Sequence, residues 1–144
     1  MANRYVRRPD GTTGSIPHDV VVPFNYDAAG NAVDTWVFVA DADYELAGVR
    51  IVPTVAGTDA GAVSADVVKA SGTTAVGSGT TMLTSTLDLK GTANTLVTRT
   101  LTATLANRRL AAGERIGINF TGVLTAAVGL IQLNLKRVQA PGEK

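Results

Sequence analysis

Apolar and polar side chains alternate along two segments near the C-terminus, residues 115–121 and 129–138. The apolar positions are Ile116, Ile118 and Phe120 in the first segment and Ile131, Leu133 and Leu135 in the second. Successive side chains of a strand point to opposite faces of its sheet, so this period indicates strands with one buried face. The best candidate for an amphipathic helix, residues 104–112, ends at Gly113 after about two turns. The pattern therefore predicts an all-β fold.

Clusters of Gly, Asp, Asn and Ser divide the rest of the chain into further short segments of strand-forming residues. With the two segments above they make eight candidate strands, at 18–23, 34–40, 45–52, 62–70, 81–89, 95–105, 115–121 and 129–138. Eight short strands in a chain of 144 residues are typical of a single antiparallel β-sandwich. Two four-stranded sheets with jelly-roll connectivity are the natural arrangement for this number, and a closed antiparallel barrel is the alternative.

Two details of the predicted strands concern packing. Leu46 is out of phase with Val49 and Ile51, and Gly48 lies between them, where a β-bulge would absorb the slip. Trp36, the only tryptophan, shares with Phe38 a run that is apolar on both faces. We expect both aromatic side chains in the core between the sheets, with a subunit interface as the alternative for Trp36.

The first seventeen residues differ from the rest, so the chain divides into an N-terminal arm (1–17), a sandwich domain (18–138) and a short C-terminal tail (139–144). Two prolines and two glycines between residues 9 and 17 disfavour both helix and central strand. We expect an extended arm that becomes ordered only against a partner. Its binding residues would be Arg4, Tyr5, Arg7 and Arg8. The alternative is a frayed terminus without a function.

The residues that support catalysis or metal binding are scarce. The chain has no cysteine, so it has no thiolate ligand, and its only histidine, His18, is the only histidine base for a serine nucleophile. Asp41 and Asp43 resemble a fragment of a calcium loop without its remaining ligands, so we expect a turn there. We therefore predict a protein that is not an enzyme and that binds neither metal nor cofactor.

The charge and hydropathy of the chain limit the classes of partner that it is expected to bind. The formal net charge is only +1 and aromatic residues make up 5% of the chain, which argues against nucleic-acid binding. No stretch approaches the roughly 20 apolar residues that a membrane helix requires. The N-terminus shows no apolar segment of the kind found in secretory signals, so we expect synthesis in the cytoplasm and no membrane partner.

The C-terminal third has a recognisable pattern, carried by the segments 101–105, 110–116, 120–122 and 129–136. Over residues 95–138 this pattern resembles the small accessory head proteins of tailed bacteriophages, the capsid decoration or cement proteins built on jelly rolls. The resemblance implies a homotrimer on the outer surface of the virion, made in the host cytoplasm. Its partner would be the major capsid protein, whose capsomer contacts it would reinforce. The basic arm also looks like the tails that such proteins lay on a capsid.

The strand predicted at 95–105 alternates along its whole length, with Arg99 as the exception on its apolar face. The other face carries Thr98, Thr100, Thr102 and Thr104. If the resemblance holds, this threonine face suits close subunit packing in the trimer, because small side chains lose little entropy when they are ordered.

Similar jelly rolls occur in fibre heads and carbohydrate-binding modules. The alternative function is therefore a carbohydrate- or receptor-binding domain of a phage fibre or appendage. That function requires exposed aromatic side chains, which Trp36, Tyr26 and Tyr44 would have to supply. A third possibility, a small enzyme of the cupin kind, requires a cluster of histidine ligands that a single histidine does not provide.

Overall fold

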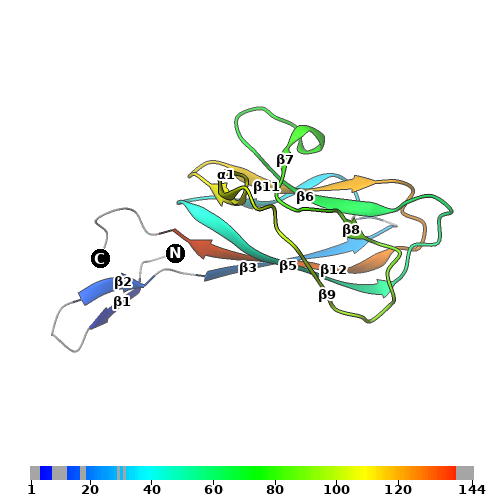
Figure 1. Cartoon of the computed structure of the whole chain (residues 1–144), viewed down its shortest axis with the longest axis horizontal. Coiled ribbons are helices and arrows are strands. Elements are labelled where there is room, and N and C mark those ends of the chain that lie inside the picture. The colour runs from blue at the N-terminus through cyan, green and yellow to red at the C-terminus, as the bar shows by residue number, and fades with distance from the viewer. Residues whose placement is uncertain (1–3, 8–12, 17–18, 29, 31, 139–144) are drawn as a thin grey trace.

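The computed structural model describes residues 4–7, 13–16, 19–28, 30 and 32–138. Two antiparallel sheets face each other across a common core, so the predicted all-β sandwich is confirmed (Figure 1). Sheet B has the order β10–β5–β12–β3, with β9 also paired to β5. Its strands are β3 (Asp19–Asp27), β5 (Tyr44–Val55), β9 (Val97–Arg99), β10 (Arg109–Leu110) and β12 (Val128–Arg137).

Sheet C has the order β4–β11–β6–β7, with β8 also paired to β6. Its strands are β4 (Thr35–Val39), β6 (Ser64–Ala70), β7 (Thr80–Thr81), β8 (Leu87–Asp88) and β11 (Arg115–Thr121). The two segments with the clearest alternation become β11 and β12, and each pairs with a neighbour on both sides. A 3₁₀ turn, η1 (Val76–Ser78), and a four-residue helix, α1 (Leu105–Arg108), are the helical elements of the described chain.

The core lies between the inner faces of the two sheets. The predicted inward residues of the central strands, Ile116, Ile118, Ile131, Leu133 and Leu135, are all buried. No polar or charged residue of the described chain falls in the buried class. Full burial of one such aliphatic side chain stabilises a fold by about 1.5 to 3 kcal/mol, so these five positions supply a large part of the cohesion between the sheets.

The strands predicted at 81–89 and 95–105 are wrong over much of their length. The first forms two short pieces, β7 and β8, which both pair with β6. Of the second only β9 forms, and the next piece paired with β5 is β10, which begins at Arg109, beyond the predicted strand. Between the pieces the chain leaves its own sheet and meets the other, where Leu83 and Leu101 form an antiparallel bridge. The amides of Thr84 and Thr102 donate to the carbonyls of Thr100 and Met82, each at 3.0 Å. One side of the sandwich is therefore closed by hydrogen bonds between the sheets.

The expected position of Trp36 in the core is also wrong. A register irregularity in β4 places Trp36 opposite Gly117, on the outer face of sheet C, while Phe38 pairs with Ile116 on the inner face. The guanidinium carbon of Arg115 lies 4.6 Å from the centre of the Trp36 ring. Phe38 packs edge-on against Tyr44, with ring centres 5.3 Å apart, as a core residue would.

The bulge predicted near Gly48 is confirmed. In the ladder between β5 and β12, Asn134 pairs with Gly48 but Leu135 pairs with Leu46, so Ala47 is the extra residue. This slip lets Leu46 and Val49 both point into the core. On the outer face the bulge leaves Ala47 exposed beside Gly48, which has no side chain.

The N-terminal arm contains secondary structure that the sequence did not predict. Strands β1 (Arg4–Arg7) and β2 (Thr13–Ile16) pair with each other in an antiparallel hairpin, with Arg4 opposite Ile16. Within the described chain this hairpin forms a sheet of its own and joins neither sheet of the sandwich. It lies beyond the start of β3, at one end of the molecule (Figure 1). In the described ranges no helix is long and apolar enough to cross a membrane.

Candidate functional site

The predicted capsid-binding residues fall on the hairpin or next to it. Arg4, Tyr5 and Arg7 belong to β1, whereas Arg8 lies outside the described residues. The prolines and glycines that argued against a strand lie in β2 or in the neighbouring residues, so they left β1 free to pair. The arm is therefore a projecting two-stranded element rather than a single extended segment.

The predicted threonine face does not form one flat surface. Thr98 lies in β9, is exposed, and pairs with Arg50 on the outer face of sheet B. Thr100 follows the end of β9, in the segment that crosses to the other sheet. The hydroxyl of Thr102 accepts a hydrogen bond from the amide of Thr104 at 3.4 Å, in the turn before α1. The crossing at Leu101 therefore separates Thr98 from Thr102 and Thr104.

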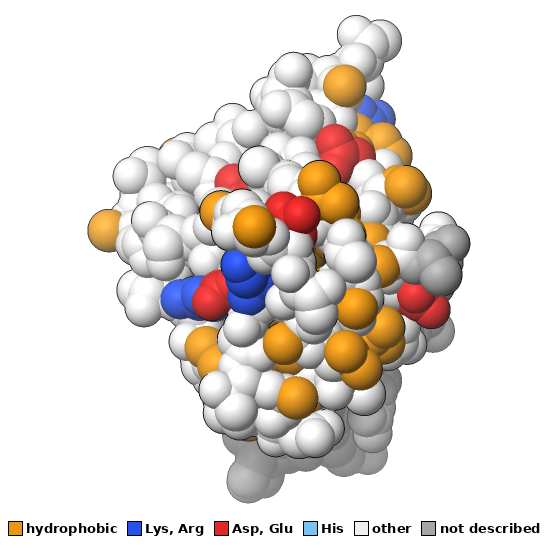
Figure 2. Space-filling view, turned by 90° about the vertical axis from the view of Figure 1, so that its right-hand side faces the viewer, with side chains coloured by type: hydrophobic (Ala, Val, Ile, Leu, Met, Phe, Trp, Pro, Cys, Tyr) orange, Lys and Arg blue, Asp and Glu red, His pale blue; other side chains and the backbone are white. Residues whose placement is uncertain are grey.

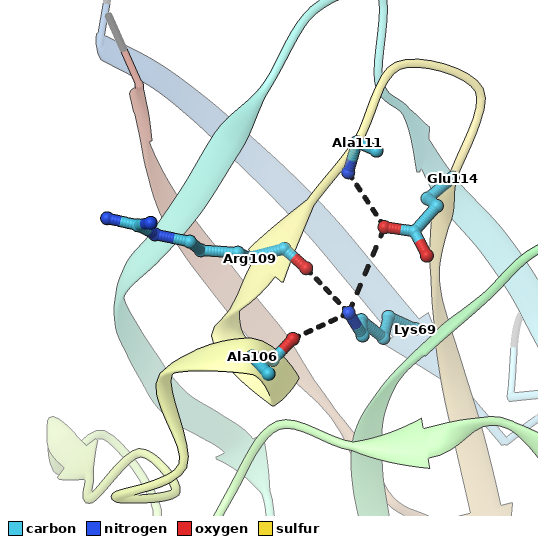
Figure 3. Close-up of polar contacts among 5 residues, drawn as sticks. All are labelled: Lys69, Ala106, Arg109, Ala111 and Glu114. Atoms are coloured by element: carbon cyan, nitrogen blue, oxygen red, sulfur yellow. Dashed lines mark hydrogen bonds and ion pairs between the residues drawn. The ribbon is translucent and has the colours of Figure 1, made fainter. Parts of the chain in front are cut away.

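A lysine ties that crossing segment to sheet C. Lys69 occupies an inward register position in β6, opposite Ile116, near the end of the sandwich. Its ammonium group donates to the carbonyls of Ala106 and Arg109, both at 2.7 Å, and lies 3.8 Å from Glu114 Oε2 (Figure 3). The same carboxylate oxygen accepts from the amide of Ala111 at 2.7 Å. The helix α1 and the strand β10 are thereby held against β6.

The tyrosines that a carbohydrate site would need are buried. Tyr26 is 0% exposed and packs against Phe120, with ring centres 6.4 Å apart. Tyr44 is also buried, and its hydroxyl donates to Asp41 Oδ1 at 2.7 Å. Burial raises the pKa of Tyr26 to about 12, and the hydrogen bond from Tyr44 lowers the pKa of Asp41. Neither tyrosine ring offers a stacking surface, so of the three aromatic residues that a carbohydrate site would need only Trp36 lies on an outer face.

The end of the sandwich opposite the hairpin carries an apolar surface that the sequence did not reveal. Loops 28–34, 56–63, 89–96 and 122–127 gather there, and Figure 2 shows hydrophobic side chains grouped on this end. Val33, Val55 and Val123 are each at least 45% exposed. An open depression of about 530 Å³ lies beside Val123, lined by Asp27, Ala28, Ala32, Val123, Leu124, Thr125, Ala126 and Val128. Each valine is isolated in the sequence, so only the fold brings them to one end.

Across the described residues, no group of three or more His, Asp or Glu side chains is placed to hold a metal ion. His18 lies outside those residues. Asp41 makes the hydrogen bond with Tyr44 described above, and Asp43 is an exposed residue whose carbonyl accepts from the amide of Val138 at 2.8 Å. No protein-family model matches the chain, and a search of curated proteins finds no significant match.

Proposed function

We propose that this protein is a structural component of a phage virion, a jelly-roll decoration protein that binds the outer surface of the capsid as a homotrimer. Its partner is the major capsid protein, and its role is to reinforce contacts between capsomers. The proposal assigns it no catalytic activity and no cofactor. Support comes from the sandwich fold, from the pattern shared by residues 95–138 with accessory head proteins, and from the projecting arm.

The observation that carries the proposal is the separation of the β1–β2 hairpin from the sandwich. An isolated two-stranded hairpin is at best marginally stable in water, because it has no third strand or packed face to support it. A partner surface supplies that support when the hairpin docks on it. Arg4 and Arg7 on this hairpin then add attraction to acidic patches, which increases the association rate and fixes the register.

Binding to capsids tests the role of the arm. Shells assembled from the major capsid protein of the same genome, without decoration, are mixed with the full chain or with a chain lacking residues 1–17, and bound protein is measured by co-sedimentation. We expect deletion to abolish binding at micromolar concentration while the circular-dichroism spectrum of the sandwich is retained. Deletion of residues 139–144 is the matched control and should leave binding unchanged. Undiminished binding without the arm would refute its role.

Light scattering tests the trimer. Three linked arms multiply the affinity of one arm through effective concentration, so trimerisation is part of the proposed mechanism. We expect the mass of three chains in multi-angle light scattering at micromolar concentration. Thr104→Arg places a long charged side chain on an exposed position of the proposed threonine interface that lies outside β9, and should reduce the mass to that of one chain. A monomeric parent protein would contradict the proposal.

A further inference from the structure

We infer that the outer face of sheet B binds an extended polypeptide segment that carries carboxylates. The site is a groove of about 390 Å³ at the bulge of β5, which we call the bulge groove. Its lining comes from four strands and consists of Asp19, Val20, Val21, Ala47, Gly48, Arg50, Thr98, Asn134, Leu135 and Lys136. The groove and the arm are different surfaces, so one can bind while the other fails.

The shape of the groove follows from the register of the sheet. Val21, Asn134 and Gly48 are cross-strand neighbours and form its floor. A side chain at position 48 would have only the Asn134 Cβ within 4 Å, at 3.9 Å, so the space above this glycine is open. Arg50 stands on one side of the floor and Lys136 on the other. Arg50 pairs with Gln132, which lies four residues before Lys136 on β12. At roughly 3.3 Å per residue, the two cations are therefore about 13 Å apart along the strand.

The polar groups around the floor are mainly hydrogen-bond donors. Gln132 donates its side-chain amide to Asn134 Oδ1 at 3.3 Å, and the amide nitrogen of Asn134 has no acceptor among the described residues, so it remains to donate. No carboxylate in the described chain lies within 4.0 Å of the charged groups of Arg50 or Lys136. Glu45, the cross-strand neighbour of Lys136, is instead paired with Arg108 and Arg109, at 3.8 and 3.7 Å. A ligand of the groove must therefore supply hydrogen-bond acceptors.

The lining favours a polypeptide over a nucleic acid. It contains no aromatic side chain on which bases could stack. Val21 is 57% exposed beside the floor, and with Ala47 it gives an apolar contact for an aliphatic side chain. An extended segment with Glu at its first and fifth positions and Val at the third matches both features, because these three side chains share one face. The two carboxylates reach the two cations while the valine between them meets Val21 and Ala47.

Titration by nuclear magnetic resonance with a defined peptide tests the site. The probe is acetyl-Glu-Ser-Val-Ser-Glu-amide, added to the ¹⁵N-labelled full chain at low salt. We expect the largest shifts at the amides of Ala47, Gly48 and Asn134, and affinity at least roughly tenfold weaker for the peptide with Gln in place of Glu, a difference of about 1.4 kcal/mol. The arm-deleted chain should bind the probe equally, which separates this site from the proposed capsid contact.

Three variants make the test specific. Arg50→Gln with Lys136→Gln should weaken probe binding at least roughly tenfold, and Gly48→Leu should block it by filling the floor without altering charge. Lys90→Gln, at the other end of the sandwich, removes a charge without touching the groove and should change nothing. The inference is overturned by the absence of shifts at 5 mM peptide, by equal weakening in Lys90→Gln, or by binding of Gly48→Leu at parental affinity. Tighter groove binding by hexathymidylate would overturn the choice of a polypeptide.

Discussion

Removal of the Lys69 ammonium is the most direct test of how the crossing segment is held. Lys69→Met keeps most of the aliphatic chain but deletes the donor that serves the carbonyls of Ala106 and Arg109. A hydrogen bond to a charged group contributes about 1.5 to 3 kcal/mol. The lower value applies here, because water can reach the released carbonyls and the Lys69 side chain is itself 17% exposed. The loss of the ion pair with Glu114, at 3.8 Å, adds less than about 1 kcal/mol.

The expected total is a decrease of about 3 kcal/mol in the free energy of unfolding. For a chain of this size it corresponds to a fall of roughly 6 to 12 °C in Tm, measured by calorimetry at pH 7. Lys90→Met is the matched control, since Lys90 Nζ also donates to two carbonyls, of Asp59 and Gly61, but from an exposed loop. Its Tm should stay within about 2 °C of the parent. If Lys69→Met melts at the parental temperature, the cost of desolvating the ammonium cancels its hydrogen bonds, and the reasoning fails.

Three further predictions concern single positions in the sheets. Tyr26 has a pKa of about 12 in the fold against 10.0 unfolded, so the stability it contributes is complete below pH 10 and falls by about 2 to 3 kcal/mol as pH rises to 12. Urea titrations of Tyr26→Phe should lack this loss, and a parallel decline in both proteins would contradict it. Gly129→Ala would place a Cβ 2.6 Å from the Val52 carbonyl oxygen and in steric clash with the Tyr26 side chain. We therefore expect at least about 2 kcal/mol of destabilisation in the same urea titration, and a neutral effect would disprove the contact. Burial raises the pKa of Asp66, so its ionisation at neutral pH opposes folding. The variant Asp66→Asn still accepts the hydrogen bond from Thr81 and should be more stable than the parent at pH 7 but equally stable at pH 3. Melting curves at both pH values will show this.

The central strands were predictable because their pattern has a local cause. Each central strand alternates apolar and polar residues and faces one core, so the residue order alone indicates which face is buried. The buried positions are Ile116, Ile118, Leu133 and Leu135. The bulge at Gly48 was predictable for the same reason, since only an extra residue brings Leu46 and Val49 to one face.

The errors occur where long-range contacts override the local period. The alternation of residues 95–105 continues past Arg99, but the backbone there bonds to residues 82–84 of the other sheet instead of extending β9. Trp36 faces outward because an irregularity in β4 sets its phase, and its partners Arg115 and Gly117 are about 80 residues away along the chain. The bulge groove escaped prediction because its lining comes from four strands, and the pattern of no single strand indicates it.

The position of the arm relative to β3 has a mechanical consequence. The hairpin continues the direction of β3 along the long axis of the molecule, so tension on a docked arm acts nearly parallel to that strand (Figure 1). β3 is joined to β12 by a ladder that runs from Asp19 to Asp27. A parallel force loads all the rungs of this ladder together, whereas a perpendicular force would open them one after another. Under the proposed capsid role, a swelling shell would therefore meet shear resistance from the whole ladder before the sandwich yielded.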